Sequence, residues 1–250
     1  MELVENYSKR RLTYEADKLP ALSGVAREMQ TMMQDEYLAG LWRKDIVEGL
    51  CWSSSPETPA SPSRYRAPSW SWASLDTEIE YYFGGDVDGS YLVDFKDAAV
   101  ALADTNPFGE VRDGWLLLSG HLKAVRLVEG DPKCEGSPPL LEVSDGSIEK
   151  LCDVTYAELV VDISSLDGEK VQAHCLPILH TMLCHGVICL LLAPEGTVAL
   201  PQSSKLLPSP EPNHTVEYQR IGLARFRGVH DKDKFLSWLS ASPKQSISIR

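Results

Sequence analysis

The stretch from Arg66 to Ser74 constrains the fold of this chain more than any other. Its sequence, Arg66-Ala67-Pro68-Ser69-Trp70-Ser71-Trp72-Ala73-Ser74, alternates two indole side chains with small residues. Alternate residues of an extended strand point to opposite faces, so Trp70 and Trp72 would share one face. The alternation therefore predicts a central strand with a deeply buried Trp face, where a helical front half meets a β-rich back half.

The first 50 residues carry a helical pattern. Apolar residues recur at spacings of three and four over residues 19–33, after Asp17 as a suitable N-cap and with Pro20 in the first turn. The same spacing predicts a second helix from Glu36 to Leu50. Residues 1–16 form a polar lead-in with no complete core of their own.

The chain after the Trp pair is rich in strand-forming residues. A turn is expected at Asn106-Pro107-Phe108-Gly109, and Asp231 is the expected N-cap of one short late helix carrying Phe235, Trp238 and Leu239. The predicted strands cover residues 78–83, 91–102, 115–125, 157–163, 175–182, 187–193, 216–227 and 246–249.

This order of elements predicts the fold class. A run of helices followed by a run of strands is typical of an α+β protein, here with N-terminal helices packed on a mainly antiparallel β-sandwich or open barrel. The expected organisation is a helical segment over residues 1–52, a Pro/Ser-rich connecting loop over residues 53–63 and a β-rich domain over residues 64–250.

The charge of the chain favours some partners over others. With 36 acidic and 24 basic residues, the formal net charge is −12, which argues against nucleic acid and anionic membrane surfaces and favours protein partners. No apolar run reaches the roughly 20 residues of a membrane span, and the N-terminus lacks a secretion signal. The six cysteines form no CxxC pair, so reduced thiols and a cytoplasmic location are expected.

Several short motifs follow one another along the chain in an order that resembles a known family. They are Tyr7-Ser8-x-Arg10-x-Leu12-Thr13, Asp17 to Ala26, Tyr37 to Trp42, Tyr65 to Ser74, Asn106 to Gly109 and Arg220-Ile221-Gly222. Taken together, they resemble the fungal heterokaryon-incompatibility (HET) domain proteins. The resemblance covers nearly the whole chain, and its specificity comes from the order of the motifs.

The resemblance implies a function. In these proteins a HET block, similar in fold to TIR domains, precedes the Tyr-Ser-x-Arg region, where this chain almost begins. We therefore expect this chain to correspond to the region downstream of a HET block. It would come either from a truncated gene model or from a standalone remnant. It would be a non-catalytic accessory or interaction module, linked to non-self recognition and programmed cell death. One alternative is part of an enzyme whose TIR-like, nucleotide-hydrolysing block lies upstream.

A second alternative is a small-ligand binding module built on Arg66, Trp70 and Trp72. Indoles stack on sugars, bases and cations, and an arginine beside them could add charge to such a site. The competing interpretation, which we favour, is that the tryptophans are core residues that hold the helices to the sheet. The exposure of the two indole rings distinguishes the two interpretations.

The sequence predicts no catalytic residue, cofactor or metal. It contains no Gly-x-Ser-x-Gly, GxGxxG or P-loop motif. Gly84 to Gly89 carries an Asp-x-Asp pair but lacks the closing Glu of a calcium loop, so a turn is expected. One crowded segment lacks the paired spacing of zinc ligands and is expected to pack in the core; it holds His174, Cys175, His180, Cys184 and His185.

Overall fold

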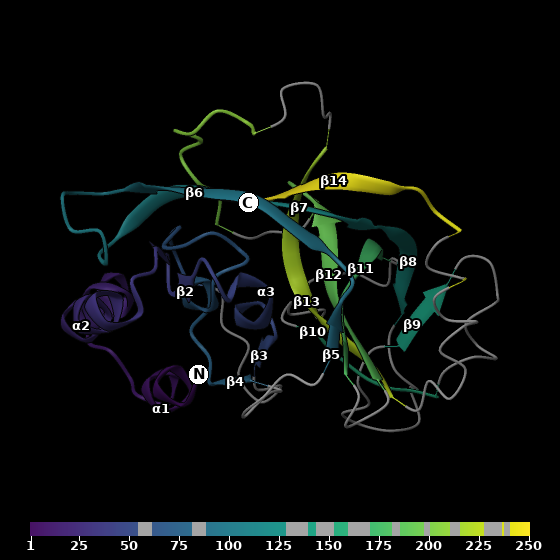
Figure 1. The fold of residues 1–250 in the computed structure, drawn as a ribbon, viewed down its shortest axis with the longest axis horizontal. Coiled ribbons are helices and arrows are strands. Elements are labelled where there is room, and N and C mark those ends of the chain that lie inside the picture. Colours follow the sequence, from purple (N-terminus) through teal and green to yellow (C-terminus); the bar gives the residue numbers. More distant parts are fainter. Residues whose placement is uncertain are drawn as a thin grey trace.

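The chain is an α+β protein, as predicted, with few helices and a mainly antiparallel sheet (Figure 1). The computed structural model describes residues 1–54, 62–81, 89–128, 140–143, 153–159, 171–181, 186–197, 201–210, 216–227, 237 and 241–250. The α-helices are α1 (Glu2–Ser8), α2 (Ser23–Met33) and α3 (Ile46–Gly49), and the 3₁₀ helices are η1 (Glu15–Lys18), η2 (Pro20–Leu22) and η3 (Trp72–Ser74).

Within the described residues, ten strands form the main sheet, in the order β6-β7-β14-β13-β12-β11-β8-β9, with β10 paired to β13 and β5 paired to β11. Their bounds are β5 Gly89–Tyr91, β6 Asp94–Leu102, β7 Val111–His121, β8 Lys123–Val128, β9 Leu140–Val143, β10 Asp153–Leu159, β11 Val171–Thr181, β12 Gly186–Pro194, β13 Glu217–Arg227 and β14 Lys244–Ile249. Among the described pairs, β13 and β14 run parallel and the others antiparallel. Figure 1 shows β6 running over the helices at one end of the molecule.

Two smaller sheets accompany the helices. Strands β1 (Tyr37–Leu38) and β2 (Leu41–Trp42) form a short hairpin, and β3 (Trp52–Ser54) pairs with β4 (Ile79–Tyr81). None of the helices among the described residues combines the length and the apolar character that a bilayer crossing requires.

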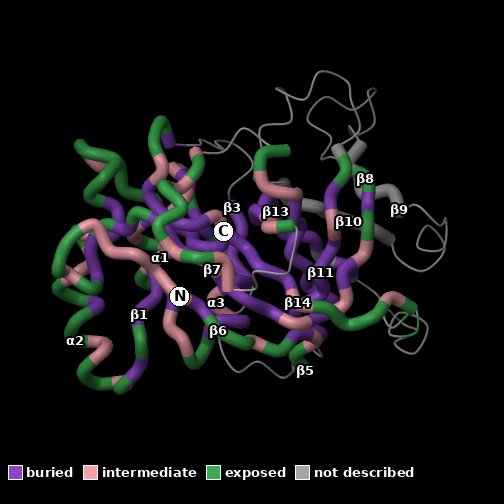
Figure 2. Tube along the Cα trace, turned by 90° about the horizontal axis from the view of Figure 1, so that it is seen from above, coloured by how far each residue is buried: buried purple, intermediate pink, exposed green. Residues whose placement is uncertain are grey.

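One large hydrophobic core joins the helical half to the sheet. It includes Leu50 and Trp52 from the first 54 residues, Trp72 from the stretch Arg66–Ser74 (the Trp segment), and Leu190 and Ile247 from the sheet. The predicted segments 1–52 and 64–250 therefore both contribute to the same core. Figure 2 shows the buried residues along the middle of the molecule and exposed residues on the outer side of α2.

The predicted helix from Glu36 to Leu50 is wrong over most of its length. The chain instead forms the β1–β2 hairpin, because Ala39 (φ 45°) and Gly40 (φ 100°) both adopt left-handed backbone conformations that no right-handed helix contains. Only α3, Ile46–Gly49, is helical. Of the apolar residues that suggested a helix face, the hairpin and α3 bury Leu38, Leu41, Ile46 and Leu50, whereas Trp42 is half-buried.

The predicted strand through Trp70 and Trp72 is also wrong. Here the chain forms a turn, with the N–H of Ser71 donating to the carbonyl of Pro68 over 2.9 Å, and then the 3₁₀ helix η3. The Ser71 hydroxyl oxygen accepts a 3.0 Å hydrogen bond from the N–H of Ala73 and so caps η3. Both indoles are nevertheless 0% exposed, as the core interpretation predicts.

The remaining expectations divide into three groups. The predicted strands at 78–83, 91–102, 216–227 and 246–249, the β11–β12 hairpin and the Asn106–Gly109 turn are confirmed. The lead-in over residues 1–16 holds α1, and the helix expected from Asp17 begins at Ser23 after two 3₁₀ turns. The late helix after Asp231 lies, apart from Ser237, outside the described residues, as do most of the connecting loop and Gly84 to Asp88.

Candidate functional site

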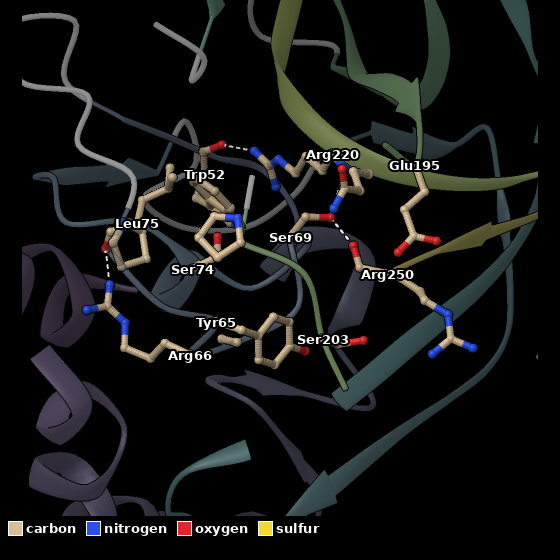
Figure 3. Close-up of a pocket in the computed structure, with 14 residues that line it drawn as sticks. Trp52, Tyr65, Arg66, Ser69, Ser74, Leu75, Glu195, Ser203, Arg220 and Arg250 are labelled. Atoms are coloured by element: carbon tan, nitrogen blue, oxygen red, sulfur yellow. Dashed lines mark hydrogen bonds between the residues drawn. The ribbon is translucent and has the colours of Figure 1, made fainter. Parts of the chain in front are cut away.

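A small polar cavity of about 30 Å³ lies beside the Tyr65–Ser74 segment. Side chains from this segment, from β3, from β13 and from the residue after β14 line it. Three of the lining residues are arginines: Arg66, Arg220 and Arg250. Figure 3 shows Arg66 and Arg250 at opposite sides of the cavity, Tyr65 and Ser203 between them, and Arg220 beside Trp52.

Arg66, a predicted binding residue, holds the surrounding loops together. Its Nε donates to the carbonyl of Ala73 over 2.7 Å, its Nη2 to Leu75 over 2.9 Å and its Nη1 to Glu15 over 3.1 Å. Nη2 also lies 2.8 Å from a carboxylate oxygen of Asp76. A guanidinium with this many fixed partners is a scaffold element, and this one ties the Trp segment to η1 and to the chain that follows η3.

Trp70 and Trp72, the other two predicted binding residues, also serve the scaffold. Nε1–H of Trp72 donates to the carbonyl of Gly40 over 2.9 Å, and its ring meets Tyr7 edge to face at 6.1 Å. The carbonyl of Trp70 accepts a 3.1 Å hydrogen bond from Nε1–H of Trp52. Since both rings are fully buried, the three predicted residues do not form an open stacking platform: Arg66 lines the polar cavity and Trp72 lines a different one.

Arg220, on β13, carries a buried charge at the polar cavity. Its guanidinium carbon lies 3.6 Å from the ring centroid of Trp52, and its Nη1 donates to the carbonyl of Leu50 over 2.8 Å. Nη2 donates to the carbonyl of Trp52, and the backbone N–H of Arg220 donates to the Ser69 hydroxyl over 2.8 Å. Burial lowers the pKa of Arg220 to about 9.

Arg250 has carboxylate partners. Its Nη1 lies 3.0 Å from both carboxylate oxygens of Asp113, and its Nε lies 2.9 Å from Glu217. Burial alone would raise the pKa of Asp113, but hydrogen bonds from the Leu207 N–H and the Ser203 hydroxyl, together with Arg250, hold it below its ordinary value. Asp113 is therefore charged at neutral pH and neutralises Arg250.

Two further ionisable groups, Tyr65 and Glu195, line the polar cavity. The buried Tyr65 hydroxyl has no hydrogen-bond partner among the described residues, and burial raises its pKa, so it remains a neutral donor. Glu195 is the one carboxylate among the described lining residues, and its Oε2 lies 2.7 Å from Lys205 Nζ. The cavity therefore offers more positive than negative charge.

A second cavity, of about 230 Å³, lies under the N-terminal helices. Its lining is almost wholly apolar and comes from α1, α2, the β1–β2 hairpin and the Trp segment, with Asp45 as the one charged residue among the described lining residues. Leu3 lines this cavity and is also an exposed apolar residue, as is Met1. On α2, Met29 lines the cavity, and Val25 and Met32 share its helix face at i−4 and i+3.

The segment considered for zinc contributes to the core instead. Cys175 and Cys189 are buried on neighbouring strands, and His174 meets Tyr218 edge to face at 5.3 Å. Cys184 and His185 lie outside the described residues. Within the part of the chain that is described, no group of three or more His, Cys, Asp or Glu side chains is placed to hold a metal ion.

Only part of the polar cavity could be inferred from sequence motifs. Tyr65 immediately precedes the Trp segment, and Arg220 begins the Arg220-Ile221-Gly222 motif, but neither was predicted as a site residue. The Asp113–Arg250 pair joins residues 137 positions apart, and no local pattern predicts such a contact.

Comparison of the chain with known protein families, with curated proteins and with solved structures finds no match. The geometry of the two cavities and the surface around them therefore carries the functional argument.

Proposed function

We propose that this chain is a non-catalytic interaction module of the HET type, which acts in the cytoplasm in non-self recognition and cell death. Its partner is a HET block, and the contact is made by a docking surface on α1 and α2. This docking surface consists of Leu3, Val25, Met29 and Met32 together with the mouth of the apolar cavity.

The observation that carries the proposal is the distribution of exposed apolar side chains. Of the eight large hydrophobic residues that are exposed in the described part of the chain, five lie within residues 1–32; they are Met1, Leu3, Tyr14, Val25 and Met32. Exposed apolar residues beside an apolar cavity are typical of a protein–protein interface. The HET resemblance adds the identity of the partner, because the HET block of that family precedes the motif that begins at Tyr7.

The chemistry of the buried hydroxyls and of one thiol supports a non-catalytic role. The Ser71 hydroxyl donates to the carbonyl of Ala39 over 2.5 Å, and the Ser69 hydroxyl donates to the carbonyl of Arg250 while it accepts from Arg220. Burial raises the pKa of the Cys51 thiol well above its ordinary value, so it does not form the reactive thiolate. Each of these groups serves the scaffold.

Co-expression in a fungal host tests the proposal. The chain alone, a HET block alone and the two as separate polypeptides are expressed, and growth arrest is scored. We expect the chain alone to leave growth unchanged and to alter the arrest that the HET block causes. Growth arrest by the chain alone, or hydrolysis of NAD⁺ by the purified chain, would show that the proposal is wrong.

A further inference from the structure

The apolar cavity of about 230 Å³ lies between elements that come from several parts of the chain. Five half-buried apolar residues contribute to its lining: Val4 of α1, Leu22 of η2, Met29 and Met33 of α2, and Trp42 of β2. Figure 1 shows α1, α2 and β2 at the same end of the molecule. Protein interiors contain few voids larger than a water molecule, so an apolar space of this size favours an occupant.

The volume of the apolar cavity suits a short hydrocarbon chain. In other proteins, an apolar cavity of about 150 Å³ stays dry and binds one benzene molecule. By proportion, a volume of about 230 Å³ accommodates about nine carbon atoms. Met29 and Met33 help such a cavity to adapt to its occupant, because the unbranched methionine side chain has three rotatable bonds.

The opening of the apolar cavity carries a negative charge. Asp45 is the one acidic or basic residue among the described lining residues, and it is exposed, so it lies where the cavity meets solvent. Its side chain makes no capping hydrogen bond to α3, and no ion pair among the described residues includes it. Trp42 and Tyr81 add aromatic rings to the lining, and the faces of such rings attract cations. A carboxylate and aromatic rings together favour a positively charged head group.

We propose that the apolar cavity binds a cationic amphiphile, an alkyl chain of about eight carbon atoms with an ammonium head group at Asp45. Burial of the alkyl chain provides the affinity, and the carboxylate selects a cation over a neutral or anionic head group. The net charge of −12 attracts the same ligands. The mouth of this cavity also belongs to the docking surface, so a bound amphiphile would compete with the proposed partner. The inference does not depend on that partner, because it concerns the chain alone.

Isothermal titration calorimetry on the full chain tests the length of the ligand. Butyl-, hexyl-, octyl- and dodecylammonium are titrated at constant ionic strength, below the concentrations at which they form micelles. We expect saturable 1:1 binding that tightens about fourfold for each added CH₂ group up to about eight carbon atoms and then levels off. Affinity that does not depend on chain length, or that rises steadily to dodecylammonium, would overturn the proposal.

A pair of substitutions on α2 tests the location of the ligand. Met29→Trp places a larger side chain in the lining of the cavity, whereas Met32→Trp places the same side chain at a residue that is 77% exposed and outside the described lining. Met29→Trp should weaken the binding of octylammonium about tenfold or more, and Met32→Trp should leave it unchanged. Equal affinities of the two variants would mean that the ligand binds elsewhere.

Octanol and octanoate, which keep the alkyl chain and change the charge, test the head group. Octylammonium should bind more tightly than both, and Asp45→Asn should weaken its binding about threefold or more without affecting octanol. The matched control is Asp17→Asn, at an exposed aspartate outside the described lining. Binding of octanol or octanoate as tight as that of octylammonium would overturn the proposal. If Met29→Trp does not fold, the series of chain lengths and Asp45→Asn still decide the matter.

Discussion

The indole N–H of Trp72 donates a 2.9 Å hydrogen bond to the carbonyl of Gly40, at the turn of the β1–β2 hairpin. This contact joins the Trp segment to the region that was predicted as a helix. A Cβ atom at position 40 would lie 2.6 Å from Nε1 of Trp72, and φ at Gly40 is +100°. Close packing of Trp72 therefore requires glycine at this position.

Gly40→Ala should destabilise the chain by about 2 kcal/mol or more, because both the clash and the positive φ oppose a side chain. The matched control is Gly24→Ala near the start of α2, where an added Cβ meets nothing within 4 Å. That control should stabilise the helix by up to about 1 kcal/mol. Urea unfolding of both variants measures the two effects, and equal effects would contradict the packing described for Trp72.

The lowered pKa of Lys18 predicts a specific pH dependence of the free energy of unfolding. Burial, with the charge of Arg66, lowers the pKa of Lys18 to about 8, while Asp76 opposes the shift. Because the unfolded chain keeps this proton up to about pH 10.4, the native state gains stability as pH rises from about 8. Between pH 7 and pH 9 the gain should be about 1 kcal/mol. Lys18→Met should lack this gain, and Lys9→Met, at an exposed lysine, should keep it.

The buried Asp113–Arg250 pair should be far more important to stability than an exposed pair. Asp113→Asn removes one of the two carboxylates that contact the buried Arg250 guanidinium and should cost about 2–3 kcal/mol at pH 7, because Glu217 remains as a partner. The control is Asp94→Asn, which breaks an exposed 2.6 Å pair with Lys244 and should cost at most about 1 kcal/mol.

The contribution of the Asp113–Arg250 pair to the free energy of unfolding should decrease at acidic pH. Since the folded-state pKa of Asp113 is lowered, its contribution is present above about pH 4 and is lost as pH falls through the folded-state value. The difference between wild type and Asp113→Asn in urea unfolding should therefore shrink below about pH 4. A difference that stays constant down to pH 2 would mean that the carboxylate charge does not stabilise the fold.

Sequence patterns predicted most of the strands but not the backbone around the two tryptophans. Period-two alternation suits a strand, yet here Pro68 and the Ser71 cap produce a turn and a 3₁₀ helix with both rings still inward. Helical spacing over residues 36–50 was equally misleading, because the Ala39-Gly40 turn reverses the chain and still buries the same apolar residues. Periodicity reports burial more reliably than backbone conformation.

The polar cavity could not have been predicted as a unit. Its groups come from segments as far apart in the sequence as Trp52 on β3 and Arg250 after β14, and their contacts depend on how β13 and β14 pack against the Trp segment. Of the three residues that the sequence analysis considered for binding, only Arg66 is among the described lining residues of this cavity. Arg66 contacts backbone carbonyl groups and Asp76, whereas Arg220 has no acidic partner among the described residues. The sequence could not show this difference, because it arises only from tertiary packing.

The affinity of the purified chain for a HET block tests the proposed interaction function most directly. The dissociation constant is measured by calorimetry for wild type, for Met32→Glu on the docking surface and for Leu206→Glu on a distant loop. Both residues are exposed, at 77% and 56%, so neither change should disturb the fold. We expect Met32→Glu to weaken binding about tenfold or more and Leu206→Glu to leave it unchanged. Absence of binding by the wild type, or equal affinity of both variants, would contradict the account.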